Sequence, residues 1–341
     1  MNVIEIKNLT MTYPNGKGIF DVEFEVRKGE VVGFLGPNGA GKTTAIRCLL
    51  GFMKGQSGEC TIDGRECFAN ASELCKKIGF IAGEPAFPDG MTGVEYLNYL
   101  CEVRGIKDKS KMTELIAYFE FDPKGKIKRM SKGMKQKTAI VAAFLHDPDI
   151  YILDEPTSGL DPIMQSKFVD LILREKKRGK TILMSSHMFD EIERASDFVV
   201  IIKNGRIVAK DRVKALKQMQ KKVFIVESPD FKKMKVGFDC NAVSDTQGEF
   251  LVPASEVDKF VKEISKYKVD GLMSKEVSLE SIFMNYYAAA APDISSLGSV
   301  SSGTRPSREA TTSSDRSSLL PSTRLETSGA AAAKSRKGGG K

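Results

Sequence analysis

Nine consecutive residues, Gly36 to Thr44, read Gly-Pro-Asn-Gly-Ala-Gly-Lys-Thr-Thr and constrain this chain more than any other segment. A glycine, four residues and then Gly-Lys-Thr form the P-loop pattern, in which the backbone curls so that successive N–H groups face phosphate oxygens. The apolar run Val31–Leu35 precedes the loop as a buried parallel strand would, and Ala45, Ile46 and Leu49 follow with helical spacing. This order of strand, loop and helix predicts a site for a nucleoside triphosphate.

The residues of the loop have distinct expected roles. Lys42 would reach the β- and γ-phosphates, and the Thr43 hydroxyl would take one position on Mg²⁺. The helix that follows would direct the positive end of its dipole at the same anion. The loop residues expected to contact the nucleotide are Gly36, Asn38, Gly39, Ala40, Gly41, Lys42, Thr43 and Thr44.

A second motif narrows the chemistry. The apolar run that starts at Ile150 ends in two adjacent acids, Asp154 and Glu155, followed by Pro156. At the end of a buried strand, Asp154 is placed to hold Mg²⁺ directly or through water. Glu155 points differently and can polarise a water molecule aimed at the γ-phosphate, as a general base. The pair predicts hydrolysis of the nucleotide.

Composition excludes several other classes. The formal net charge is +8, but Lys and Glu are interspersed and part of the excess lies in the last residues, so we expect no nucleic-acid partner. The chain has two histidines and six cysteines without a Cys-x-x-Cys pair, which argues against zinc and favours reduced, mostly buried thiols. No apolar run approaches the ~20 residues of a membrane span, and the N-terminus lacks the pattern of a secretory signal.

Residues 1–213 alternate between strand and helix patterns. Three segments predict an antiparallel layer beside the P-loop strand: 3–6, 20–26 and 60–62. Two segments with helical periodicity, 93–104 and 112–119, predict a helical insertion that spans about 84–140. Three later apolar runs predict further parallel strands: 151–153, 181–184 and 198–202.

The remaining residues divide in two. Strand patterns at 223–227 and 249–252 and an amphipathic helix at 255–267 predict a small α+β accessory domain over 214–287. From residue 288 to 341 the chain is rich in Ser, Thr, Arg and Gly and has few residues that could form a core. We expect a disordered tail there, with the composition of a linker, tag or vector-derived segment.

Taken in order, the motifs resemble a known family. Ser131-Lys132-Gly133-Met134-Lys135-Gln136 lies a short span before the Asp-Glu strand. With the P-loop, it makes residues 1–287 similar to the ATP-binding-cassette (ABC) ATPases, and specifically to nucleotide-binding subunits of bacterial exporters. The commonest form of this signature is Leu-Ser-Gly-Gly-Gln, from which the chain departs at Met130, Lys132 and Met134. The form found here is frequent in subunits of drug and peptide exporters.

The resemblance implies a fold and further site residues. The fold is an α/β P-loop NTPase with an antiparallel β layer, the helical insertion and the C-terminal α+β appendage. Tyr13 would stack on the adenine of ATP, and His187 would contact the γ-phosphate and act with Glu155 in catalysis. The signature residues would bind the ATP held by a partner subunit: Ser131, Lys132, Gly133 and Met134. The D-loop residues would cross the dimer interface: Ser158, Gly159 and Asp161.

One position departs from the family in a way that bears on the metal. The family usually has Gln after the strand that here runs from Ile78 to Ile81, where this chain has Gly83 followed by Glu84. Gly83 has no side chain to contact Mg²⁺ or its water. Either Glu84 replaces that contact or the coupling through this loop is weaker.

The resemblance implies an ATPase with ATP and Mg²⁺ as cofactors, which powers export through a separate membrane permease. It would work as a homodimer, or with a second ABC ATPase, peripherally on the cytoplasmic side of the membrane. A soluble ABC-type ATPase of DNA repair is disfavoured, because the segment between Thr44 and Ser131 lacks a long coiled coil. P-loop kinases are disfavoured because they have no use for the Ser131 segment or His187. A slowly hydrolysing regulatory or immunity module stays open, and no residue identifies the transported substrate.

Overall fold

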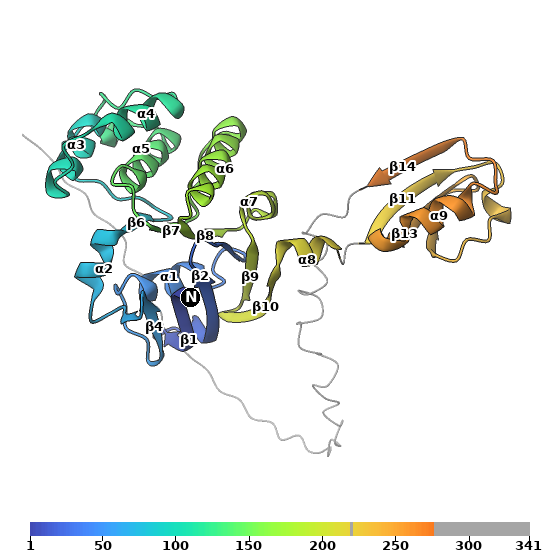
Figure 1. Cartoon of the computed structure of the whole chain (residues 1–341), viewed down its shortest axis with the longest axis horizontal. Coiled ribbons are helices and arrows are strands. Elements are labelled where there is room, and N and C mark those ends of the chain that lie inside the picture. The colour runs from blue at the N-terminus through green and yellow to red at the C-terminus, as the bar shows by residue number, and fades with distance from the viewer. Residues whose placement is uncertain (219–220, 276–341) are drawn as a thin grey trace, which may run out of the picture. The chain divides into compact units, whose positions relative to one another are not determined.

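The computed structural model describes residues 1–218 and 221–275 (Figure 1). The first of these parts contains a six-stranded sheet in the order β10-β9-β3-β8-β7-β6. The strands are β3 (Val31–Leu35), β6 (Ile78–Ile81), β7 (Ile150–Asp154), β8 (Thr181–Ser186), β9 (Phe198–Lys203) and β10 (Arg206–Arg212). All neighbouring pairs are parallel except β10 with β9. Strands β3, β7 and β8 are buried along their whole length, which explains the apolar runs that predicted them.

A second, antiparallel sheet has the order β2-β1-β4-β5. Its strands are β1 (Asn2–Thr12), β2 (Gly18–Arg27), β4 (Ser57–Ile62) and β5 (Arg65–Glu66). Alternate residues of β2 are buried, as in a sheet with one face on the core. That face shares a hydrophobic cluster with α1 (Lys42–Leu49) and with Val32 and Phe34 of β3. The predicted antiparallel layer is confirmed, with strands longer than their apolar patterns.

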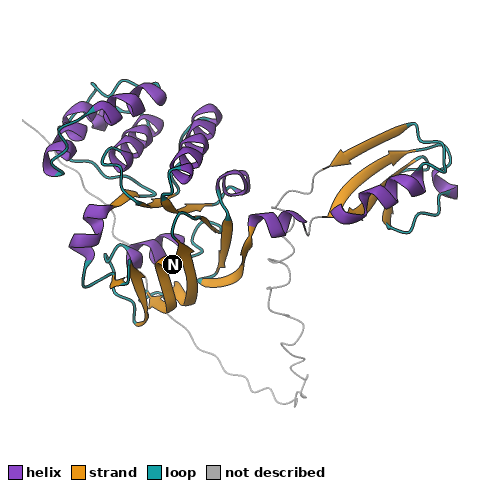
Figure 2. Ribbon diagram, viewed as in Figure 1, coloured by secondary structure: helices purple, strands orange, loops and turns teal. Residues whose placement is uncertain are grey.

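Helices form the rest of the first part (Figure 2). They are α2 (Ala71–Lys77), α3 (Gly93–Val103), α4 (Ser110–Tyr118), η1 (Ile127–Arg129), α5 (Lys132–Phe144), α6 (Pro162–Lys177), α7 (Phe189–Ala195) and α8 (Val213–Gln218). Helix α3 begins with a reciprocal capping box between Thr92 and Glu95, and α5 begins at Ser131, whose side chain accepts from the Met134 N–H. Helices α3, α4 and η1 and most of α5 lie within the range 84–140 of the predicted helical insertion, whose status as a subdomain stays a prediction. No helix among the described residues is long and apolar enough to cross a membrane.

Residues 221–275 form a separate antiparallel sheet with the order β12-β13-β11-β14. Its elements are β11 (Lys221–Glu227), η2 (Phe231–Lys233), β12 (Asp239–Ala242), β13 (Gln247–Pro253), η3 (Ala254–Glu256), α9 (Val257–Ile264) and β14 (Gly271–Lys275). Phe224, Phe250 and Phe260 are the centre of its core. The predicted helix at 255–267 is shorter, and the sequence pattern missed β12 and β14, because nearly all of their residues are exposed. Residues 276–287 of the predicted accessory domain and the predicted tail at 288–341 lie outside the described residues.

His146, just beyond the end of α5, lies where its charged form is disfavoured. It lines a pocket with Cys75, Tyr96 and Arg104. Burial, and then the charge of Arg104, lower the pKa of His146 from 6.5 to about 4. An imidazole that stays neutral beside a cation has a structural and not a catalytic role here.

The pH dependence of stability follows from that shift. Between about pH 6.5 and 4 the unfolded chain binds a proton at this histidine that the folded chain rejects, so the free energy of unfolding falls as the pH is lowered. Urea unfolding of the wild type and of His146→Leu, measured from pH 7 to pH 5, should show a smaller loss in the variant. Parallel curves would contradict the assignment. Asp147 does not interfere between pH 7 and 5, because its ordinary pKa of 3.8 and the value of about 2, to which its hydrogen bond to Arg178 lowers it, both lie below that window.

Candidate functional site

The loop between β3 and α1 has the geometry of a phosphate cradle. Gly41 has a φ of +112°, and a Cβ atom at this position would lie 2.6 Å from the Ile19 side chain. Only glycine satisfies both conditions, which explains why the loop needs it immediately before Lys42. The loop residues Asn38, Gly39 and Gly41 line a cavity of about 430 Å³ together with residues of α1. The structure thus places the predicted P-loop beside a space for a ligand.

The turn between β1 and β2 forms another wall of this cavity. Tyr13, Asn15 and Lys17 line it, and the Tyr13 hydroxyl lies 3.5 Å from Thr44 Oγ1. Tyr13 was predicted from the sequence, whereas Asn15 and Lys17 were not. Their position in the turn that follows Tyr13 could have indicated them. Strands β1 and β2 pair on either side of this turn, so residues of the turn lie beside the P-loop together with Tyr13. Stacking of Tyr13 on adenine stays a prediction.

Lys42 is the central cation of the site and is only 5% exposed. Its Nζ lies 3.0 Å from Glu155 Oε1 and donates to the carbonyl oxygens of Gly36 and Pro37. The other carboxylate oxygen of Glu155 lies 2.7 Å from His187 Nδ1. The contacts run from Lys42 through Glu155 to His187, so the structure joins three predicted residues that are far apart in the sequence.

Asp154 and Thr43 meet beside this row of contacts. Thr43 Oγ1 donates to Asp154 Oδ2 at 2.7 Å, and Ser185 Oγ donates to Asp154 Oδ1. Asp154 is 2% exposed and is the register partner of Ser185. Ser185 was not predicted from the sequence, although it belongs to the Ser-Ser pair directly before His187. Ser185 fixes the Asp154 carboxylate from the neighbouring strand.

The hydroxyl of Thr43 and the carboxylate of Asp154 are oxygen donors of the kind that Mg²⁺ prefers. Mg²⁺ in nucleotide sites keeps few protein ligands and completes its coordination with phosphate and water oxygens. Within residues 1–218 and 221–275, no group of three Asp, Glu, His or Cys side chains could hold a metal alone. A magnesium ion at Thr43 and Asp154 fits these residues as part of a nucleotide complex.

A second cavity, of about 700 Å³, extends from the same residues toward α5. Its lining includes Thr43, Asp154, Glu155, His187, Gly83, Glu84, Lys132 and Ser158. A Cβ atom built on Gly83 would lie 3.3 Å from Asp154 Oδ2, so position 83 faces the carboxylate without a side chain. Glu84 lines the cavity too, and its action on the metal stays a prediction.

The signature and D-loop segments lie against each other. Ser131 is the N-cap of α5, and Asp161 is the N-cap of α6, where its side chain accepts from the Met164 N–H at 3.0 Å. Lys132 Nζ donates to Ser158 Oγ at 2.9 Å, which ties the two segments together. Among the described residues that line the two cavities, Ser131, Gly133 and Met134 do not appear. The structure thus brings the P-loop, Asp154, Glu155 and His187 together and leaves most of the signature outside the site.

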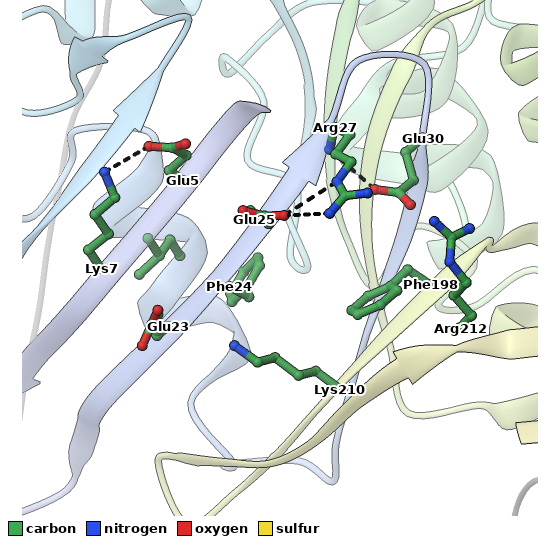
Figure 3. A pocket seen from close by; sticks show the side chains of 11 residues that line it. Glu5, Lys7, Glu23, Phe24, Glu25, Arg27, Glu30, Phe198, Lys210 and Arg212 are labelled. Atoms are coloured by element: carbon green, nitrogen blue, oxygen red, sulfur yellow. Dashed lines mark hydrogen bonds and ion pairs between the residues drawn. The ribbon is translucent and has the colours of Figure 1, made fainter. Parts of the chain in front are cut away.

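A groove of about 400 Å³ lies elsewhere, between β1–β2 and β9–β10 (Figure 3). Phe24 and Phe198 line it together with charges of both signs. The Glu25 carboxylate accepts from Arg27 at 3.1 Å, which neutralises two of these charges. None of the predicted site residues lines this groove, so it is separate from the phosphate-binding loop.

Comparison with known proteins places the chain in a family. The family described as ABC transporter matches residues 19–158. The bacitracin transport ATP-binding protein BcrA of Bacillus licheniformis is 38% identical over 237 residues, which are 69% of this chain and 78% of that protein. The fluoroquinolones export ATP-binding protein of Mycobacterium tuberculosis is 29% identical over 286 residues, which are 83% of this chain and 92% of that protein.

Solved structures agree with the fold. The structure described as an ATP-binding subunit of an ABC transporter has a TM-score of 0.57 and 32% identity, and the match covers 63% of this chain and 92% of that one. A dimeric ATP-binding cassette solved with ADP and phosphate after hydrolysis has a TM-score of 0.56 at 24% identity, over 62% of this chain and 98% of that one. The predicted fold class is confirmed. The chain belongs to the ATP-binding subunits of ABC transporters.

Proposed function

We propose that this ABC-family ATPase hydrolyses ATP at the site built from Lys42, Thr43, Asp154, Glu155 and His187. The observation that carries the proposal is the row of contacts in which Glu155 joins Lys42 to His187 beside the P-loop. With ATP bound, Lys42 would exchange its backbone carbonyl partners for β- and γ-phosphate oxygens, which are stronger acceptors because they are charged. Mg²⁺, when held by Thr43 and Asp154, offsets the negative charge of the phosphates.

Glu155 acts as the general base of this reaction. Its carboxylate accepts a proton from a water molecule, whose oxygen bonds to the γ-phosphorus while the bond to the β-phosphate oxygen breaks and ADP leaves. His187 Nδ1, at 2.7 Å, holds the carboxylate in place and is near enough to the same space to contact the γ-phosphate. The Glu155 side chain is only partly exposed, so few bulk water molecules can hydrogen-bond to its carboxylate in place of the reacting water.

Two subunits complete the site in this proposal. Ser131 caps a helix of 13 residues, and its hydroxyl and the Gly133 N–H lie at the positive end of the helix dipole. They suit a γ-phosphate held by the P-loop of a second copy or of a sister ATPase. Ile163, just after the D-loop, is 69% exposed, which supports a contact surface there.

A separate permease is the second partner, and the helical region supplies the surface for it. Tyr99 and Val103 lie one turn apart on α3 and are 48% and 65% exposed, and Phe52 is 58% exposed. Exposed apolar side chains on neighbouring elements are typical of binding surfaces. Tyr96, by contrast, packs against the core and against Phe87. We infer that the subunit lies on the cytoplasmic face of the membrane and powers export. One relative is named for the export of fluoroquinolones and another for the transport of bacitracin.

Lys42→Ala tests the phosphate site. Charge-assisted hydrogen bonds contribute about 1.5–3 kcal/mol, so the dissociation constant for ATP should rise about tenfold to a hundredfold. Isothermal titration with ATP measures it, and Lys28→Ala, exposed in the turn before β3, serves as the control. Unchanged affinity in the Lys42 variant would remove the residue from the phosphate site.

Glu155→Gln tests the general base. The amide cannot take the proton, so turnover should fall at least about a hundredfold while ATP affinity stays near the parental value. Phosphate release and ATP binding are measured on the same preparations. Glu73→Gln, exposed on α2, is the matched control. Parental turnover in Glu155→Gln would show that another group is the base.

Purification of the Glu155→Gln variant from detergent-solubilised native membranes in ATP tests the partners. We expect a polytopic membrane protein at near-equal stoichiometry, because the nucleotide-bound dimer should persist when hydrolysis is blocked. Only self-dimers or soluble partners would contradict the transporter role. Slow parental turnover even with the membrane partner would favour the regulatory module, for which the absent side chain at Gly83 is the supporting observation.

A further inference from the structure

The backbone at Glu155 is strained. Its φ is +46°, in the left-handed region that residues other than glycine seldom adopt. A tight turn follows, closed by the Ser158 N–H, which donates to the Glu155 carbonyl oxygen at 3.1 Å. Such a conformation persists only where surrounding contacts hold it. The contacts that hold this turn therefore determine where the Glu155 carboxylate points.

Two hydrogen bonds from outside the turn hold its first half. The Glu155 N–H donates to Ser185 Oγ at 3.0 Å, which fixes it to β8. Gln136 Nε2 donates to the Pro156 carbonyl oxygen at 2.6 Å. Gln136 is 1% exposed and Pro156 is buried as well. A buried carbonyl that loses its donor is costly, so this bond fixes the Pro156–Thr157 peptide, one residue beyond Glu155.

A third contact holds the second half of the turn. Lys132 Nζ donates to Ser158 Oγ at 2.9 Å. Gly159 has a φ of +83°, and a Cβ atom there would lie 2.8 Å from Lys132 Cγ and Cδ. The lysine stem therefore passes directly over the Gly159 backbone. Gln136 and Lys132 both belong to α5, so one helix is hydrogen-bonded to the turn at two residues, Pro156 and Ser158.

We propose that Gln136 is a positioning residue for Glu155, with Lys132 as a second and weaker tie. Helix α5, which begins at the Ser131 signature segment, thereby sets the orientation of the carboxylate in its own subunit. Gln136 touches neither nucleotide nor water in this proposal and acts through the Pro156 peptide. The inference rests on the role of Glu155 as general base given under the proposed function.

Gln136→Met tests the proposal, because methionine has similar length and cannot donate a hydrogen bond. Displacement of a catalytic group by about 1 Å can cost up to about a hundredfold, so we expect kcat to fall between about tenfold and a hundredfold. The KM for ATP and the equilibrium affinity should stay within about twofold, since the P-loop contacts are untouched. All measurements use the full-length chain.

Thr138→Val is the matched control. Thr138 is equally buried on α5, and its hydroxyl donates to the Met134 carbonyl oxygen of its own helix at 2.9 Å. It should keep parental kcat. Parental kcat in Gln136→Met would overturn the proposal. Equal losses in both variants, or a loss of ATP affinity parallel to the loss of kcat, would overturn it too, because they indicate general damage to the helix.

Lys132→Met decides the matter if Gln136→Met does not fold. The lysine is exposed, and the substitution keeps the stem over Gly159 while removing the bond to Ser158. A smaller fall in kcat at unchanged KM supports the proposal. Unchanged kcat overturns it, and so does a raised KM for ATP, because Lys132 would then act on the partner's ATP and not on the turn after Glu155. The Glu155→Gln variant separates the two levels of inference. If it is inactive while Gln136→Met is fully active, the general base stands and only the positioning role fails.

Discussion

The contact between the Lys42 ammonium and the Glu155 carboxylate, 3.0 Å apart, is the interaction on which the site depends. A lysine that is 5% exposed needs compensating oxygen atoms, since an unpaired buried charge is very costly. Glu155 and the loop carbonyls supply them. Without the curled glycine-rich backbone those carbonyls would not converge on Nζ, and without the strained turn after β7 the carboxylate would not reach it. The P-loop and the turn after β7 therefore stabilise each other through the charge of Lys42.

The sheet explains how such distant segments meet. Strands β3, β8 and β7 are neighbours in that order, and all three run in the same direction. The P-loop follows β3, His187 follows β8, and Asp154 and Glu155 lie at the end of β7. Since the carboxyl ends of parallel strands meet at one edge, the parallel pairing of these strands gathers the site there. The same parallel strands thus form the hydrophobic core and position the site residues at their ends.

The sequence predicted well what is encoded in contiguous runs. The P-loop, the Asp-Glu strand and the strands around them could be identified because apolar runs and glycine spacing are local signals. Asn15, Lys17 and Ser185 were not predicted, because each reaches the site from another strand or turn. Their neighbours Tyr13 and His187 marked the places, but an ordinary polar residue does not show which side chain makes the contact. Gln136 stands in the signature segment, and its bond to the Pro156 carbonyl could not be predicted from that position. Strands β12 and β14 were missed for a related reason: their residues are exposed, so they lack the alternation that burial imposes.

The close packing of Gly133 on the D-loop limits how experiments on the signature can be interpreted. A Cβ atom at position 133 would lie 2.9 Å from the Gly159 carbonyl oxygen, a distance that side chains do not adopt. Any larger residue there would push α5 and the turn after Glu155 apart within a single subunit. An inactive Gly133 variant would therefore be ambiguous, since damage inside one protomer and loss of contact with a neighbour's nucleotide would look the same. Variants at Ser131 leave this packing intact, although they also remove the hydrogen bond that caps α5.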